Sequence, residues 1–222
     1  MKHLIIFDFD GVVADSEVLS NAVLAAMVTE LGLPTSLNES YDRYMGKRTS
    51  DIAVMVAGEI GRALPAEFVA EFQRRVSARL AAELQPVTGV AEFIGRFKHH
   101  AHAIASASSP ERLALCLKKI GLAGHFGDNV FSASLVARGK PDPDIYLLAA
   151  ARMKAHPDQC IVLEDSPSGV RAGRAAGMTT IGLLAGSHIR PSTRDQLLAA
   201  GAHHIARDYA EATALLHSLD VS

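Results

Sequence analysis

The hydrophobic positions of this chain repeat with two different periods, and the period changes twice along the sequence. A short apolar run at residues 3–7 opens the chain and is rich in residues that favour β-strands. For about seventy residues after Glu17, hydrophobic residues instead recur at the three- and four-residue spacing of amphipathic helices. After Pro86, short β-favouring runs return and alternate with helical segments. The pattern predicts one strand, then a helical stretch, then regular alternation of strands and helices.

The helical stretch is predicted to form four helices. Its first helix ends at Gly32, because a glycine followed by Pro34 is the expected stop signal. The four predicted helices cover residues 18–31, 39–45, 49–60 and 65–84. We expect them to form a compact helical unit of their own.

The alternation of strands and helices in the rest of the sequence predicts an α/β fold. Predicted strands cover residues 101–106, 129–132, 160–163, 178–183 and 203–205, and predicted helices cover residues 110–120, 143–153, 167–176, 194–200 and 209–219. Alternation of this regularity is typical of a Rossmann-like parallel sheet with helices on both faces. The first strand must join this sheet, so we expect a core domain of residues 1–15 and 86–222 and an inserted four-helix domain of residues 16–85.

Composition narrows the class of protein. The chain has 222 residues, of which 49% are hydrophobic, so it can bury a core without disulfides. Its formal net charge of −2 leaves no basic surface of the kind that binds nucleic acid or an anionic membrane. Cys116 and Cys160 are far apart, and the first apolar run is too short for a signal peptide. We therefore predict a cytoplasmic protein, a monomer or alternatively a dimer, that binds neither nucleic acid nor membrane.

The ten histidines raise the question of a metal cluster. His99, His100 and His102 lie where a predicted strand begins, and His203 and His204 open another strand. Neither group has the i, i+4 spacing around an acidic residue that a helical metal site needs. We therefore predict that both groups lie on the solvated surface.

Two aspartates, Asp8 and Asp10, close the first predicted strand. Alternate residues of a strand point to the same side, so the two carboxylates would leave the strand end together and repel each other. A divalent cation would relieve this repulsion, and oxygen ligands of this kind suit Mg²⁺. The structural alternative is that both are ordinary turn and helix-capping residues, which aspartates often are.

Polar residues also follow the other predicted strands, whose carboxyl ends share one edge of a parallel sheet with the first strand. The second strand ends at Ser106 and Ala107, and the loop after the third strand carries Lys140. The fourth strand is followed by Glu164 and Asp165. Carboxylates, a hydroxyl and a lysine are therefore expected to meet at one edge of the sheet.

Three of the predicted helices start with a capping residue followed by proline, an arrangement typical of a helix amino terminus. These pairs are Ser109-Pro110, Asp142-Pro143 and Ser166-Pro167. Helix amino termini attract anions, so with a lysine and a carboxylate cluster they describe a phosphate site. Taken singly, each of these residues has a structural alternative as a turn residue, a loop charge or a helix cap.

These segments resemble the four sequence motifs of the haloacid dehalogenase superfamily, in order and in spacing. The matching segments are Asp8-Phe9-Asp10-Gly11-Val12, Ser106, Lys140-Pro141 and Glu164-Asp165 with Ser166-Pro167-Ser168-Gly169. The helical insertion resembles the α-helical cap of that superfamily, so the likeness covers nearly the whole chain. The resemblance implies a Mg²⁺-dependent phosphatase that acts on small phosphate monoesters through an aspartyl-phosphate intermediate.

The resemblance also implies a role for the matching residues. Asp8 would be the nucleophile, and Asp10 would first protonate the leaving oxygen and then take a proton from water. Lys140 would neutralise the nucleophile and the phosphoryl oxygens in the transition state. Ser106 and the neighbouring Ala107 would bind the phosphoryl group.

The metal ligands implied by the resemblance are the Asp8 carboxylate, the Asp10 backbone carbonyl and Asp165. Glu164 would contribute directly or through water. Dehalogenases of the superfamily need neither the second aspartate nor the metal. Asp10 and Asp165 therefore favour phosphoryl transfer.

Substrate choice would belong to the cap, whose most basic loop contains Lys47 and Arg48. Two cations beside hydroxyls suit a polyol or a carboxylate carried on the phosphate ester, so we predict a sugar phosphate or phospho-sugar acid as substrate. The alternative is that both cations lie on a solvated turn before a helix capped by Thr49 or Ser50.

Two other functions stay open. A β-phosphoglucomutase-like enzyme resembles the chain in the same motifs, but such mutases carry a histidine in the first cap helix where this chain has Ser20. The cap arginine, Arg48, also sits one place early for a mutase. Both departures favour hydrolysis. The second alternative is a catalytically silent binding protein on the same fold, which would usually lack the nucleophile.

Overall fold

The computed structural model describes residues 3–47 and 49–221, and the chain divides into two compact units. The first, the sheet unit, consists of Met1–Asp15 and Gln85–Ser222, and the second, the helical unit, of Ser16–Leu84. The predicted inserted domain ends at residue 85, whereas this residue belongs to the sheet unit; the other bounds are the same.

The sheet unit contains a six-stranded parallel sheet with the strand order β3-β2-β1-β4-β5-β6. The strands are β1 (Leu4–Phe7), β2 (Ala101–Ser106), β3 (Val130–Ser132), β4 (Cys160–Glu164), β5 (Thr179–Leu183) and β6 (His204–Ala206). Strand β1 lies in the middle, where Leu4 pairs with Ala101 of β2 and with Cys160 of β4. The predicted parallel α/β fold is confirmed, and the first strand joins the same sheet as the later ones.

The helices of the sheet unit connect its strands. They are α5 (Val90–Arg96), α6 (Pro110–Lys119), α7 (Ala123–Phe126), α8 (Asp144–Arg152), α9 (Pro167–Ala175), α10 (Thr193–Ala199) and α11 (Tyr209–Ser218), with short 3₁₀ turns η1 (Ala133–Leu135) and η2 (Pro157–Gln159). The sequence pattern does not predict α5 and α7, because seven and four residues span too few turns to reveal a period.

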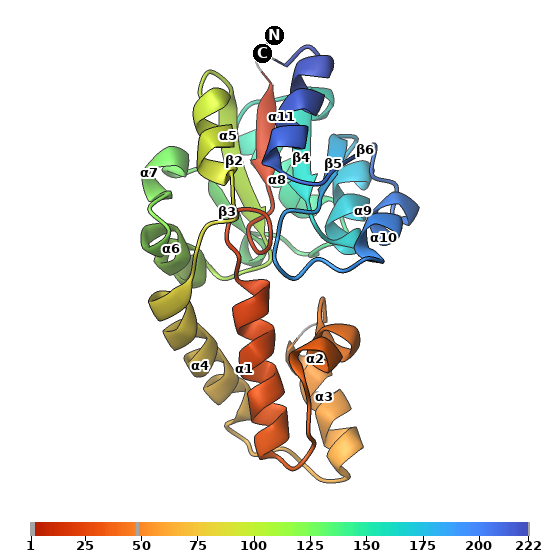
Figure 1. The fold of residues 1–222 in the computed structure, drawn as a ribbon. Helices are drawn as coiled ribbons and strands as arrows, with labels where there is room; N and C mark the ends of the chain where they lie inside the picture. The colour runs from red at the N-terminus through yellow and green to blue at the C-terminus, as the bar shows by residue number, and fades with distance from the viewer. Residues whose placement is uncertain (1–2, 48, 222) are drawn as a thin grey trace. The chain divides into compact units, whose positions relative to one another are not determined.

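Helices cover both faces of the sheet, as Figure 1 shows. Leu4 and Ile6 of β1 belong to one core cluster with side chains of α8 and α9. On the other face, Phe7 packs edge-on against Phe93 of α5, which also contacts Tyr209 of α11. All four residues of β1 are therefore buried, as expected for a central strand between two helical layers.

The helical unit consists of the four predicted helices. They are α1 (Glu17–Glu30), α2 (Leu37–Tyr44), α3 (Thr49–Ile60) and α4 (Phe68–Glu83). Helix α2 begins two residues before the predicted start, because Ser36 and Glu39 form a reciprocal capping box there. No helix in the described ranges is both long enough and apolar enough to cross a membrane.

The predicted surface position of His100 and His102 is wrong. Only 8% of the surface of each is exposed, whereas His99 and His203 are exposed as predicted. His102 lies in β2, and its ring packs edge-on against Phe7 with 5.8 Å between the ring centroids. Because helices cover both faces of the sheet, His102 is buried within its strand, and histidine spacing does not reveal this. His100 lies just before β2, where its Nδ1 accepts from His3 N at 3.1 Å.

The burial of His102 is expected to destabilise the protein in mildly acidic solution. Burial lowers the pKa of His102 from 6.5 to about 4. Between pH 6.5 and about pH 4, the His102 side chain is protonated in the unfolded chain but stays neutral in the folded protein. The contribution of His102 to stability is therefore complete above pH 6.5 and is lost as the pH falls toward 4, by up to about 2 kcal/mol at pH 5.

His102→Phe should not show the loss of unfolding free energy at acidic pH that the burial of His102 causes. Urea unfolding at pH 8 and pH 5 would measure it, and the difference in unfolding free energy between the two pH values should be smaller in the variant than in the wild type. The exposed His99→Phe serves as the control and should keep the wild-type difference. Equal differences in His102→Phe and the wild type would contradict the prediction.

Candidate active site

The carboxyl ends of three adjacent strands bring the predicted site residues to one edge of the sheet. Asp8 follows β1 directly, Ser106 is the last residue of β2, and Glu164 is the last residue of β4. Asp165 follows Glu164, and Lys140 lies on the loop between β3 and α8. The topology explains this convergence, because parallel strands end at the same edge.

Asp8, Glu164 and Asp165 form a buried acidic cluster. Each offers a carboxylate oxygen, and these oxygens lie within 4.8 Å of one another. The exposed fractions of the three residues are 8%, 0% and 7%. Buried carboxylates this close together repel one another strongly, and their oxygens are the donors that Mg²⁺ prefers. The cluster therefore fits a divalent cation.

Lys140 is the positive partner of this cluster. Its Nζ donates to Asp8 Oδ1 at 2.6 Å and to Glu164 Oε1 at 2.7 Å. Burial by itself would lower the pKa of Lys140, but the charges of Asp8 and Glu164 outweigh burial and hold that pKa well above its usual value. One lysine offsets one of three carboxylates, so the ionised cluster keeps a negative excess that a divalent cation would balance.

Both oxygens of Glu164 are already held by neighbouring groups. Tyr146 Oη donates to Oε1 at 2.9 Å, and the backbone N and Oγ of Ser166 each donate to Oε2 at 2.9 Å. A Cβ atom at Gly169 would lie 1.5 Å from Oε1, so only glycine fits there. Glu164 is thus fixed in place, and the sequence pattern does not identify Tyr146 as its partner.

Asp165 contacts His188, a residue that the sequence pattern also misses. His188 Nε2 lies 3.1 Å from Asp165 Oδ2. Burial raises the pKa of the Asp165 carboxyl, and the hydrogen bond from His188 opposes that rise. The turn after β1 also approaches Asp165. Gly11 in this turn has φ +81°, and a Cβ atom there would lie 1.8 Å from Asp165 Oδ2.

The carboxylate of Asp10 is not part of the acidic cluster found among the described residues. Ser108 Oγ donates to its Oδ2 at 2.6 Å, and Arg112 Nη2 donates to its Oδ1 at 2.7 Å. Both partners come from the segment that follows β2. The sequence pattern misses them, although the cap Ser109, whose Oγ accepts from Arg112 N, places Arg112 in the first turn of α6.

The remaining predicted site residues lie in different places. Ser106 is buried, and its Oγ accepts from Ser108 N at 3.0 Å, while Ala107 is exposed. Lys47 is exposed on the turn between α2 and α3 of the helical unit, and Arg48 lies outside the described residues. Phosphate or substrate binding by these residues stays a prediction.

Two of the three predicted helix caps are confirmed. Ser109 and Ser166 each accept a backbone N–H of the first turn, with proline as the next residue. Asp142 does not cap α8, which begins at Asp144 after Pro143. The Asp142 side chain instead pairs with Arg138 at 3.2 Å. Here an aspartate followed by proline forms an ion pair on the surface and does not cap a helix.

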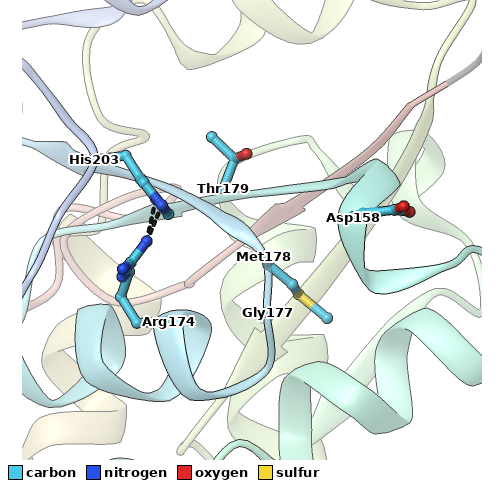
Figure 2. A pocket seen from close by; sticks show the side chains of 6 residues that line it. All are labelled: Asp158, Arg174, Gly177, Met178, Thr179 and His203. Atoms are coloured by element: carbon cyan, nitrogen blue, oxygen red, sulfur yellow. Dashed lines mark hydrogen bonds between the residues drawn. The ribbon is translucent and has the colours of Figure 1, made fainter.

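The structure also has a surface pocket of about 320 Å³, and Figure 2 shows the residues that line it. It is lined by Asp158, Arg174, Gly177, Met178, Thr179 and His203. These residues precede or begin the strands β4, β5 and β6. The pocket therefore lies at the amino-terminal edge of the sheet, opposite the edge that carries the acidic cluster.

Comparisons with known proteins find relatives that match most of the chain. The model of the haloacid dehalogenase-like hydrolase family matches residues 2–177. A phosphorylated carbohydrates phosphatase from Thermotoga maritima is 36% identical over 80% of this chain and 82% of its own length. A 6-phosphogluconate phosphatase from Escherichia coli is 27% identical over 84% of this chain and 85% of its own. The crystal structure of a HAD family hydrolase from Deinococcus radiodurans with bound phosphate and sodium aligns with a TM-score of 0.86 at 31% identity, covering 99% of this chain and 97% of that one.

Proposed function

This chain belongs to the haloacid dehalogenase-like hydrolase family, and we propose that it is a Mg²⁺-dependent phosphatase that hydrolyses sugar phosphates or phospho-sugar acids through an aspartyl-phosphate intermediate. The observation that carries the proposal is the buried cluster in which Lys140 contacts Asp8 and Glu164. A carboxylate nucleophile, further carboxylates for a divalent cation and a fixed positive charge are the groups that phosphoryl transfer needs.

The substrate class rests on the relatives and on the cap loop. The two curated relatives are named for phosphorylated carbohydrates and for 6-phosphogluconate, and the Deinococcus radiodurans structure holds phosphate. Lys47 and Arg48 would bind the hydroxyls or the carboxylate of such a substrate through charged hydrogen bonds. A second polar group beside the phosphate therefore distinguishes the proposed substrates from simple alkyl phosphates.

In the first step, an Asp8 carboxylate oxygen attacks phosphorus in line with the leaving oxygen. The new bond joins Asp8 to phosphorus, the bond from phosphorus to the ester oxygen breaks, and Asp10, which enters this step in its protonated form, gives its proton to that oxygen and becomes a carboxylate. In the second step, water attacks phosphorus, Asp10 takes the proton, and Asp8 is released as a carboxylate with inorganic phosphate as product. Arg112 and Ser108 orient the Asp10 carboxylate by holding one oxygen each.

Asp8, Asp165 and the Asp10 backbone carbonyl would hold Mg²⁺, with Glu164 directly or through water. When bound, the cation supplies positive charge that offsets the phosphoryl oxygens and the carboxylates. Lys140 adds a fixed charge beside the nucleophile, and Ser106 binds a phosphoryl oxygen.

We expect Mg²⁺-dependent phosphate release that EDTA abolishes. The experiment is a screen of phosphate release over a panel of sugar phosphates, phospho-sugar acids, nucleotides and phosphoamino acids, each with Mg²⁺ and with EDTA. Carbohydrate-derived esters should react at least about tenfold faster than the others, because they offer hydroxyls or a carboxylate to Lys47 and Arg48 without the bulk of a nucleotide base or the positive ammonium group of a phosphoamino acid. Adding Mg²⁺ in excess of EDTA should restore the rate.

The same screen separates the two alternatives. A mutase would isomerise β-glucose 1-phosphate, and the inorganic phosphate released would be much less than the amount of ester consumed. A binding protein on this fold would turn over no ester under any condition. Either result, or a rate that EDTA leaves unchanged, would overturn the proposal.

A further inference from the structure

We infer that His188 is a positioning residue that fixes Asp165 for metal binding; the inference rests on the proposed function, in which Asp165 is a metal ligand. His188 Nε2 lies 3.1 Å from Asp165 Oδ2, and the exposed fractions of the two side chains are only 6% and 5%. A buried hydrogen bond of this kind holds one carboxylate oxygen in a set direction. The other oxygen is then left for the cation.

The position of the His188 ring is itself determined by the loop after β5. A Cβ atom at Gly186 would lie 2.7 Å from His188 Cε1, and one at Gly11 would lie 2.6 Å from the same atom. The ring therefore fills a space that exists only because both neighbours are glycines. Next to His188 in sequence, Ser187 N donates to Asp15 Oδ1 at 3.0 Å and ties the loop to the segment after β1.

This arrangement connects three segments that are far apart in the sequence. The turn after β1 carries Asp8 and Gly11, the end of β4 leads into Asp165, and the loop after β5 carries His188. Groups that hydrogen-bond metal ligands without touching the metal typically change its affinity by about 10- to 100-fold. We therefore expect His188 to act on the affinity for Mg²⁺ and to have no direct contact with the substrate.

The test is a calorimetric titration of Mg²⁺ into wild type and variants, so that the measured quantity is metal affinity and not activity. His188→Leu removes the donor, and Mg²⁺ binding should weaken about 10- to 100-fold. In His188→Gln the side-chain amide reaches about as far as Nε2 and should retain most of the affinity. The matched control is His156→Leu, which removes the exposed histidine that pairs with Asp158 at 2.8 Å. It should bind Mg²⁺ as the wild type does.

Wild-type affinity in a folded His188→Leu, or no Mg²⁺ binding by the wild type, would overturn the inference. Circular dichroism and thermal unfolding in EDTA check that each variant is folded. His188→Asn provides a second test should His188→Leu not fold, because its amide ends short of the Nε2 position and cannot reach Asp165. Weaker Mg²⁺ binding by this variant supports the inference, and unchanged binding overturns it.

The outcome is separable from that of the proposed function. A wild type that binds Mg²⁺ but hydrolyses no ester would refute the phosphatase assignment and leave the titrations of the His188 variants to decide the inference. A wild type that hydrolyses phosphate esters, with His188→Leu keeping its Mg²⁺ affinity, would refute the inference alone.

Discussion

Asp8→Asn is expected to abolish phosphate release while leaving the protein folded. An amide cannot form the acyl-phosphate bond, and loss of a nucleophile typically lowers kcat by on the order of 10⁴-fold or more. The substitution keeps the size of the side chain, and Lys140 retains its contact with Glu164 at 2.7 Å, so the buried charges stay paired. Initial rates with the best substrate of the screen, together with thermal unfolding, measure the two effects separately.

Asp142→Asn is the matched control for this variant. It makes the same chemical change at an aspartate that is not a member of the acidic cluster and that pairs with the exposed Arg138. Its rate should equal that of the wild type. Intact-mass measurement of Asp8→Asn excludes deamidation back to aspartate. A variant of confirmed mass that keeps a tenth of the wild-type rate would show that Asp8 is not the nucleophile.

The convergence of Asp8, Glu164 and Asp165 could be predicted because it follows from topology. Once the alternation of strands and helices indicates a parallel sheet, the residues that follow neighbouring strands must lie at one edge. The pairing of these carboxylates with Lys140 needs more than topology, because a loop residue has no fixed direction. The sequence pattern indicates that the loop after β3 carries Lys140, but only the resemblance to a known family implies that it neutralises Asp8; the Lys140 amine donates to two of the acids.

The residues that hold the site together could not be predicted in this way. His188, Arg112 and Tyr146 each come from a loop or a helix that no period connects to the site, and each contacts a carboxylate of the site across the fold. Such contacts depend on how loops and helices pack against the strand ends, which local pattern does not determine. Asp10 illustrates the difference: its position after β1 is predictable, but its hydrogen bonds with Ser108 and Arg112 are not.

Lys140→Met is expected to lower the free energy of unfolding of the metal-free protein and to slow phosphate release. The variant leaves the Asp8 and Glu164 carboxylates buried without the amine that contacts both, and breaking a buried ion pair from one side typically costs about 3–5 kcal/mol. Loss of this charge beside the phosphoryl group should also lower kcat/KM by about 10²- to 10³-fold. Urea unfolding in EDTA and initial rates in Mg²⁺ measure these effects. The matched control is Arg138→Met, which removes an exposed cation that pairs with two acids. It should change neither the free energy of unfolding nor kcat/KM.

The dependence of stability on pH and Mg²⁺ shows whether the lost stability is electrostatic. The pKa of Lys140 is raised in the folded protein, so its stabilising charge is complete at pH 5 to 8 and would be lost only above its ordinary value of 10.5. Without Lys140, the acids relieve their repulsion by holding protons. The folded variant then gains stability relative to the wild type as the pH falls from 8 toward 5.5. Mg²⁺ should likewise raise the unfolding temperature of Lys140→Met more than that of the wild type, because the uncompensated charge is larger. A loss of stability that is the same at both pH values and unchanged by Mg²⁺ would instead indicate lost packing of the lysine side chain.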